Sequence, residues 1–149
     1  MGKKFVTFGE IMLRLKSPGH ERFFQSPSLE ATFGGGEANV AVSLSLLGKD
    51  AKFVTALPAN AIGEAAVREV RKYGVDTSAI NMTKGGRVGI YFLETGANQR
   101  PSAVVYDRAE SSIALAKPSD FGFAAIMGDA AWLHVTGIIY GTVDTAFLD

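Results

Sequence analysis

Short apolar runs of strand length alternate with longer helical patterns along most of this chain, and no other feature limits the possible folds as strongly. The runs KFVTFGE and AKFVTALP are apolar and β-branched, which predicts two buried strands. Residues 38–47 are apolar on nearly all sides and residues 61–74 are amphipathic, and a glycine closes each segment, which predicts two helices. Alternating strands and helices are typical of α/β proteins with a mostly parallel sheet, and we expect that class here.

Two β-rich segments interrupt this alternation. The segment IMLRLKS alternates apolar with polar residues, as a half-exposed strand does, and a loop punctuated by prolines follows it. Residues 85–108 contain two β-rich runs on either side of TGANQRP, which predicts a hairpin. After Pro118 a helical segment, a buried strand at 130–139 and the start of another helix restore the alternation. We expect the two β-rich segments to form an added layer at one edge of the sheet.

Composition excludes several classes of protein. The 149 residues are 47% hydrophobic, and fifteen basic and fifteen acidic residues cancel. Because no basic cluster exceeds Lys3-Lys4, we expect neither a nucleic-acid partner nor binding to a membrane surface. The absence of cysteine excludes disulfides, thiolate metal sites and a cysteine nucleophile. No apolar run approaches the roughly 20 residues of a membrane span, and Glu10 and Arg14 break the apolar N-terminal run, so we expect a cytoplasmic protein without a signal peptide.

Three consecutive glycines lead directly into the first predicted helix, in the segment FGGGEANVAVSLSLLG at 33–48. A flexible turn is one interpretation. A binding site is the other, because unpaired N–H groups and the dipole at a helix N-terminus favour polar or anionic ligands, and the amide of Asn39 suits sugar hydroxyls. Asn39 occupies the last glycine position of a dinucleotide fingerprint, and no G-K-[ST] of a P-loop is present. The segment therefore indicates a substrate site rather than a nucleotide site.

The order of these motifs resembles a known family. Gly9-Glu10 is followed by GGGEANVAVSLSLLG, FVTALPANAIGEA, RVGIYFLE and VVYDRAESS. This series resembles the N-terminal half of the ribokinase-like (PfkB) carbohydrate kinases over essentially the whole chain, and within them it is most similar to 2-keto-3-deoxygluconate kinases. Glu37 and Pro58 depart from the general family pattern and are variants associated with that branch.

The resemblance implies a fold and a division of the protein. The fold would be a ribokinase-like three-layer sandwich with a small β lid, built from two segments at about 11–33 and 86–108. Residues 1–149 would form the N-terminal, substrate-side part of the kinase domain. The G-A-G-D segment that carries the catalytic base and the anion hole belongs to the ATP-binding second half, which is absent from this chain, so no catalytic residue is expected here.

The resemblance also implies a substrate site between the carboxyl edge of the sheet and the lid. The glycine segment would bind sugar hydroxyls through Gly34, Gly35, Gly36, Glu37, Ala38 and Asn39. Tyr91 would cover the sugar, and Tyr106 and Arg108 would reach its acid end, where the planar guanidinium can pair bidentately with a carboxylate. Glu10 and Ile138 are weaker candidates.

Each candidate outside the glycine segment has an ordinary structural alternative. Tyr91 can be a normal strand aromatic, Arg108 a solvated arginine, and Glu10 the cap of a neighbouring helix. Arg87, at the start of the hairpin, is expected to be a charge at the solvent or lid edge. His134 is expected to be a core histidine with its hydrogen bonds satisfied rather than a ligand.

The implied activity is transfer of the γ-phosphate of ATP to a hydroxyl of 2-keto-3-deoxygluconate, with Mg²⁺ and an aspartate that lies outside this chain. The partner is a small-molecule sugar acid, and the exposed β edges of the lid predict at least a homodimer. Two alternatives stay open. A fructokinase or tagatose-type kinase would not need Arg108 for a carboxylate, and a non-catalytic sugar-binding module would never turn ATP over.

Overall fold

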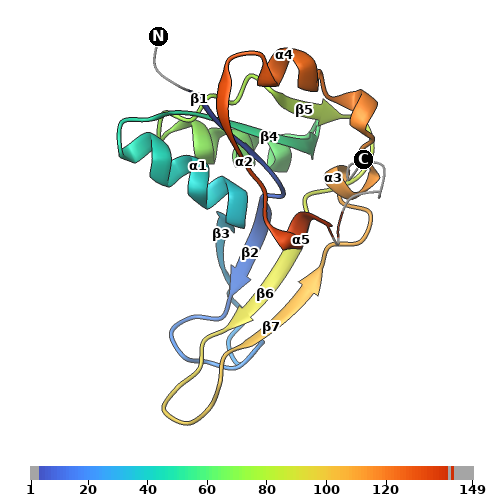
Figure 1. The fold of residues 1–149 in the computed structure, drawn as a ribbon. Helices are drawn as coiled ribbons and strands as arrows, with labels where there is room; N and C mark the ends of the chain where they lie inside the picture. The colour runs from blue at the N-terminus through green and yellow to red at the C-terminus, as the bar shows by residue number, and fades with distance from the viewer. Residues whose placement is uncertain (1–3, 141, 143–149) are drawn as a thin grey trace.

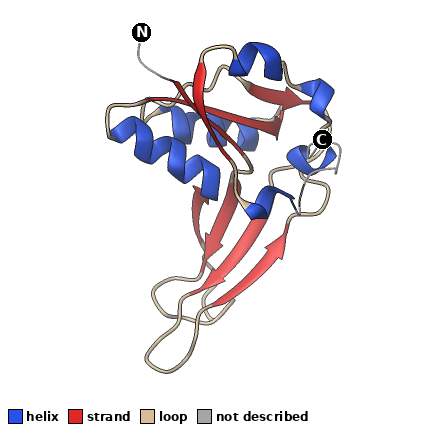
Figure 2. Ribbon diagram, in the orientation of Figure 1, coloured by secondary structure: helices blue, strands red, loops and turns tan. Residues whose placement is uncertain are grey.

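The structure, a computed structural model, describes residues 4–140 and 142, which form two four-stranded sheets (Figures 1 and 2). The first, which we call the body sheet, has the order β5-β4-β1-β8, and every neighbouring pair in it is parallel. Its strands are β1 Lys4–Phe8, β4 Asp50–Pro58, β5 Ile80–Thr83 and β8 Ala130–His134. The α/β class with a mostly parallel sheet is therefore confirmed.

Helices cover both faces of the body sheet, which gives the expected three layers. On one face, α1 (Gly36–Leu46) and α2 (Ala61–Arg71) enclose a core cluster around Phe53 and Leu57. On the other face, a second cluster around Val6 and Val54 is closed by short elements. These are α3 Ser112–Leu115, the 3₁₀ turn η1 Pro118–Asp120, α4 Phe123–Met127 and α5 Gly137–Tyr140.

The two long helices begin and end for identifiable reasons. The side chain of Asn60 accepts hydrogen bonds from the N–H groups of Ile62 and Gly63 at the start of α2, both at 3.0 Å. Gly48 and Gly74 follow the two helices with φ of +73° and +86°, a left-handed conformation that glycine adopts without penalty. The glycine stops expected from the sequence are thus confirmed.

The second sheet, which we call the lid sheet, extends away from the body (Figure 1). Its order is β3-β2-β6-β7, with β2–β3 and β6–β7 antiparallel and β2–β6 parallel. The strands are β2 Met12–Lys16, β3 Glu30–Gly34, β6 Ile90–Glu94 and β7 Ala103–Asp107. The half-exposed strand after Ile11 and the hairpin within 85–108 are confirmed, whereas β3 and β5 were not expected.

Three expectations were wrong in detail. The strand expected at 130–139 ends at His134 and gives way to α5, and it is an exposed edge strand in the described part, with Trp132 61% exposed. Helix α1 is not buried on all sides, since Leu46 and Leu47 are exposed. Nε2 of His134 is buried but has no hydrogen-bond partner among residues 4–140 and 142. The sequence had predicted that the hydrogen bonds of this histidine would be satisfied.

The helix expected from the segment GTVDTAFLD falls almost wholly outside the described residues. No helix within them combines the length and the apolar character that crossing a membrane requires.

Candidate functional site

The candidate residues meet where the lid sheet joins the carboxyl ends of the body strands. Gly9 and Glu10 directly follow β1, the glycine segment links β3 to α1, and Arg108 directly follows β7. In open α/β sheets this edge is where ligands bind, because strand ends, helix N-termini and loops converge there. The fold therefore brings sequence-distant candidates to one place.

The three glycines have different surroundings. A Cβ atom on Gly35 would lie 2.0 Å from the carbonyl oxygen of Glu10, so only glycine allows the two chain segments to approach this closely. A Cβ on Gly34 would lie 3.3 Å from the Tyr91 hydroxyl, and one on Gly36 would make an ordinary 3.5 Å contact with Thr136. Part of the glycine signal in the sequence therefore reflects chain packing rather than ligand binding.

The start of α1 leaves polar backbone groups without side-chain partners. Gly35 is the N-cap in an extended conformation, and no side chain caps it within the described residues. The first bond inside the helix runs from the N–H of Asn39 to the carbonyl of Gly35, at 2.8 Å. The N–H groups of the first turn are therefore available to a hydroxyl or an anion.

The side chain of Glu37 faces the body. It is 2% exposed, and its Oε1 accepts hydrogen bonds from the N–H and the hydroxyl of Thr136, at 3.0 and 2.5 Å. It lies directly over Gly9, where a Cβ atom would be 2.2 Å from the Glu37 Cδ. Thr136 in turn accepts from the N–H of Ile138, at 3.3 Å. The Glu37 carboxylate thus fixes the β8–α5 loop, and the part of Glu37 left for a ligand is its backbone.

The lid contributes a row of side chains on one face. Tyr91 lies opposite Tyr106 in the β6–β7 register, with ring centres 5.9 Å apart, and opposite Arg14 in the β2–β6 register. The Arg108 guanidinium carbon lies 5.8 Å from the centre of the Tyr106 ring. Tyr91, Tyr106 and Arg108 are therefore neighbours, as the site hypothesis requires. Arg14 was missed because only the strand register places it beside them.

Arg108 forms an ion pair with Glu10, across 98 residues of sequence. Its Nε and Nη2 donate to Glu10 Oε2 at 2.8 and 2.5 Å, and Nη2 also donates to the Thr142 hydroxyl at 2.5 Å. The Arg108 side chain is 20% exposed and that of Glu10 is 5% exposed. Neither the solvated arginine nor the helix-capping glutamate of the alternative interpretations is observed. Nothing in the sequence identifies Thr142 as a partner of Arg108.

Arg87 is not a free edge charge. Its guanidinium donates to both carboxylate oxygens of Asp107 and to the carbonyl of Ala109, at 3.1 Å for the last. These bonds hold the two ends of the hairpin together below Arg108. The side chain is still partly exposed, so the expected position at the lid edge is confirmed and its role is structural.

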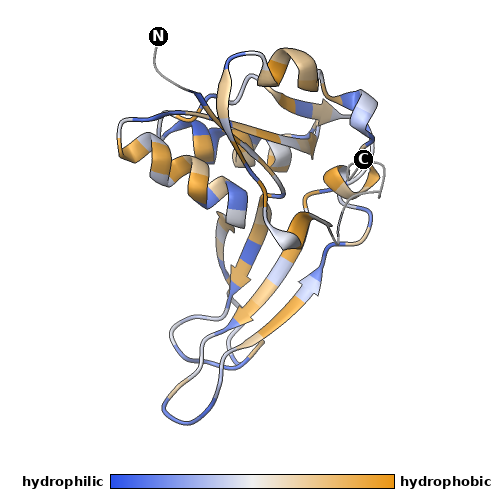
Figure 3. Cartoon of the chain, viewed as in Figure 1, coloured by the Kyte–Doolittle hydropathy of each residue, from blue (hydrophilic) through white to orange (hydrophobic). Residues whose placement is uncertain are grey.

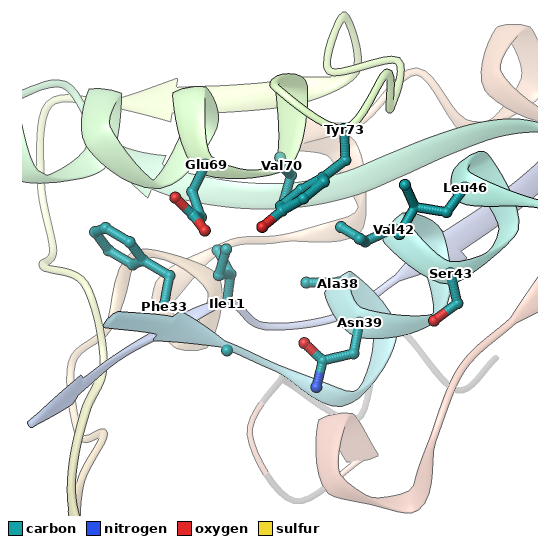
Figure 4. Close-up of a pocket in the computed structure, with 11 residues that line it drawn as sticks. Ile11, Phe33, Ala38, Asn39, Val42, Ser43, Leu46, Glu69, Val70 and Tyr73 are labelled. Carbon is teal, nitrogen blue, oxygen red and sulfur yellow. The ribbon is translucent and has the colours of Figure 1, made fainter. Parts of the chain in front are cut away.

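A pocket of about 330 Å³ lies beside the glycine segment, between α1 and α2 (Figure 4). Gly34, Ala38 and Asn39 line one side of it, and Glu69 and Tyr73 line the other. The lid tyrosines and Arg108 are not among its lining residues. The lid reaches this pocket through Phe33 of β3 instead.

The described residues contain no group of three histidine, aspartate or glutamate side chains placed to hold a metal ion.

Comparison with known proteins gives a consistent picture. The sequence model of the family described as pfkB family carbohydrate kinase matches residues 3–149. A crystal structure of 2-dehydro-3-deoxygluconokinase from Thermotoga maritima is 53% identical, with a TM-score of 0.94 over 98% of this chain and 44% of that one. The 2-dehydro-3-deoxygalactonokinase of Haloferax volcanii is 38% identical over 93% of this chain and 43% of its own length. A probable fructokinase-3 of Arabidopsis thaliana is 30% identical over 81% of this chain and 35% of its own. The chain thus spans less than half the length of these relatives.

Proposed function

Because the chain belongs to the pfkB family of carbohydrate kinases, we propose that the complete protein transfers the γ-phosphate of ATP to a hydroxyl of 2-keto-3-deoxygluconate. Relatives named for the 2-dehydro-3-deoxy sugar acids match 93% and 98% of the chain, and "2-dehydro" is another way of writing "2-keto". The observation that carries the choice of an acid substrate is Arg108, a largely enclosed guanidinium beside the lid tyrosines. An enclosed arginine suits a carboxylate, which neither fructose nor ribose has.

In this proposal the substrate lies between the first turn of α1 and the lid. The backbone of Gly34 to Ala38 and the amide of Asn39 bind hydroxyls, Tyr91 and Tyr106 cover the sugar, and Arg108 binds the acid group. Glu37 acts through Thr136 in the β8–α5 loop, which leads into α5 and Ile138. The lid excludes water, because an exposed γ-phosphate would be lost to hydrolysis.

The chain would form the substrate-side part of the kinase, with lid segments at about 11–33 and 86–108. The catalytic base and the ATP site would come from the part of the relatives' length that this chain does not span. Mg²⁺ usually binds through substrate phosphates and one or two carboxylates, and it neutralises charge on the transferred phosphoryl group. The residues described here position the acceptor, and positioning is the main protein contribution to phosphoryl transfer.

We also propose that the protein is a cytoplasmic homodimer that pairs through the lid. Strand β7 is a sheet edge with every residue exposed, and apolar residues run along the lid strands (Figure 3). A pocket there is lined only by Phe23, Phe24, Phe92 and Val105. An exposed apolar edge strand has backbone N–H and C=O groups that can pair with another chain, and a second copy would cover this edge. The absence of cysteine suits a reducing compartment.

The test of the activity is ADP release by the complete protein with Mg-ATP and, in parallel, 2-keto-3-deoxygluconate, its galactonate epimer, fructose and gluconate. We expect turnover with the two keto-deoxy acids only. Arg108→Leu should raise the KM for these acids, while Arg68→Leu on the exposed surface of α2 serves as the matched control. Turnover of fructose alone would favour the fructokinase alternative. Sugar binding without turnover of any substrate would favour the non-catalytic module.

A further inference from the structure

Glu10 is a buried carboxylate with only one oxygen in use. The residue is 4% exposed, and its Oε2 accepts both hydrogen bonds from Arg108. Its Oε1 is closed off from solvent and has no hydrogen-bond partner among the described residues. The backbone of Gly89 covers this oxygen, since a Cβ atom there would lie 2.4 Å from Oε1. Oε1 is therefore sealed beneath the lid, and a sugar in the junction has no path to it.

The donors of Arg108 can be counted. A guanidinium has five N–H donors: one on Nε and two on each Nη nitrogen. Glu10 takes the Nε donor and one Nη2 donor, and Thr142 takes the other Nη2 donor. Within residues 4–140 and 142, Nη1 has no hydrogen-bond partner. Glu10 already occupies the side-on edge of the guanidinium, which is formed by Nε and Nη2. A substrate carboxylate therefore cannot pair bidentately with that edge, and the donors left for a ligand belong to Nη1.

We propose that Glu10 is a positioning residue: it holds the guanidinium by its side-on edge, so that Nη1 is the nitrogen that binds the substrate carboxylate. This inference rests on the proposed sugar-acid kinase function. It changes the assignment of Glu10 from a weak substrate contact to a residue that acts through Arg108. It also predicts a single-nitrogen contact to the acid instead of a fork.

The surroundings explain why a carboxylate serves here. Arg108 follows an exposed lid strand, whereas Glu10 lies two residues after the buried end of β1, so the pair anchors a lid side chain to the body. Arg108 would otherwise have many rotamers, and freezing them on binding weakens affinity. The Tyr106 ring provides a further restraint on the guanidinium. The orientation is thus set before substrate arrives.

The test is a double-mutant cycle in the complete protein, with KM for 2-keto-3-deoxygluconate, KM for ATP and kcat as readouts. Glu10→Met keeps the side-chain length but removes the acceptor, and we expect it to raise the KM for the sugar acid about tenfold, the effect of losing a charge-assisted hydrogen bond. The KM for ATP should not change. Glu10→Gln keeps an acceptor oxygen and should change the sugar-acid KM by less than about threefold. Glu10→Met combined with Arg108→Leu should be no worse than Arg108→Leu alone.

Several outcomes would overturn the proposal. Glu10→Met with an unchanged sugar-acid KM would assign Glu10 to packing, and effects of Glu10→Met and Arg108→Leu that multiply would assign it a separate contact. Glu10→Gln as impaired as Glu10→Met would also contradict it. If Glu10→Met fails to fold, Glu10→Ala replaces it: a tenfold higher sugar-acid KM with an unchanged KM for ATP supports positioning, and an unchanged sugar-acid KM refutes it. A wild-type protein inactive on every sugar acid would remove the proposed function and this inference together, whereas the outcomes above leave the function intact.

Discussion

The body sheet and the lid sheet each have four strands in the described residues, but their most buried and most exposed strands lie in different sheets. Strand β4 of the body is buried over nearly its whole length, whereas every residue of β7 in the lid is exposed. Both core clusters centre on the body sheet, one on each face. The lid strands are held by their ladders and by side-chain bonds such as Arg14 to Thr32, at 2.9 Å, and Lys16 to Glu30, at 3.0 Å.

This difference separates two tasks. In the proposed function, the buried body would offer the ligand backbone groups in a fixed position, at the first turn of α1. The more exposed lid would offer the side chains that distinguish one ligand from another, Tyr91, Tyr106 and Arg108. Sites built in this way combine a rigid scaffold with an element of lower local stability that can move when the ligand binds.

The largest expected difference between the two sheets is in the free energy of unfolding lost when a side chain is truncated. Phe53, in β4, is fully buried, so Phe53→Ala should lower the free energy of unfolding by about 3–5 kcal/mol. Val105, in β7, is 53% exposed in a single copy, and at protein concentrations low enough to separate the proposed dimer Val105→Ala should change this free energy by no more than about 0.5 kcal/mol. Urea unfolding of the complete protein measures both. A cost for Val105→Ala near that of Phe53→Ala would mean that a second copy buries the lid in solution.

A smaller effect is expected at the junction of the two regions. Gly35→Ala places a Cβ atom 2.0 Å from the Glu10 carbonyl oxygen, which forces β3 and β1 apart and should cost about 1–3 kcal/mol. Gly36→Ala is the matched control, because its Cβ has room and alanine favours a helix, so stability should stay equal or rise. Thermal unfolding compares the two. Equal melting temperatures for both variants would show that the junction yields and is not rigid.

The sequence predicted the inner strands of the two sheets better than their edge strands, for a physical reason. Strands such as β4 are apolar because both faces are buried, so a run of consecutive apolar residues identifies them in the sequence. The unexpected strand β3 has the sequence EATFG, which becomes a strand only because β2 pairs with it. The edge position of β8 depends on which strands lie beside it. Pairing partners are set by the fold and leave no local pattern.

In the candidate site, too, single residues could be predicted from the sequence but their contacts could not. The glycine segment was proposed from its sequence pattern and the lid tyrosines from the family resemblance, and the structure brings them to one junction. The Glu10–Arg108 pair joins residues 98 positions apart, and the Glu37–Thr136 bonds join residues 99 apart. Glu10, Glu37 and Arg108 stood out in the sequence, but their partners did not, because the pairing depends on how the chain folds together at the carboxyl edge of the body sheet.

A local effect is expected at the tip of the lid. Arg100 donates to the carboxylate of Glu94 and, at 2.5 Å, to the carbonyl of His20, so it ties the two loops of the lid together. Arg100→Met should lower the stability of this tip by about 1 kcal/mol and speed proteolysis in residues 95–102, without changing the melting temperature of the body. Limited proteolysis with mass spectrometry measures this. Lys16→Met, which removes a more exposed pair, is the control, and equal cleavage of both variants would contradict the role of Arg100.

The smallest expected effect is electrostatic and lies in the body. Burial opposes ionisation of Asp76, but hydrogen bonds from Ser78 and the nearby Lys52 outweigh it and hold the pKa of Asp76 below its ordinary value of 3.8. A carboxylate whose pKa is lower in the folded protein than in the unfolded chain stabilises the folded protein at pH values above the unfolded-state pKa. This contribution is lost as the pH falls through the folded-state pKa. Asp76→Asn should therefore melt below the wild type at pH 6, with the difference closing as the pH drops below 3.8. Melting curves from pH 6 to about pH 3 measure it. A difference in melting temperature that stays constant from pH 6 to about pH 3 would show that the charge of Asp76 does not contribute. The two variants would then differ only in packing and hydrogen bonding.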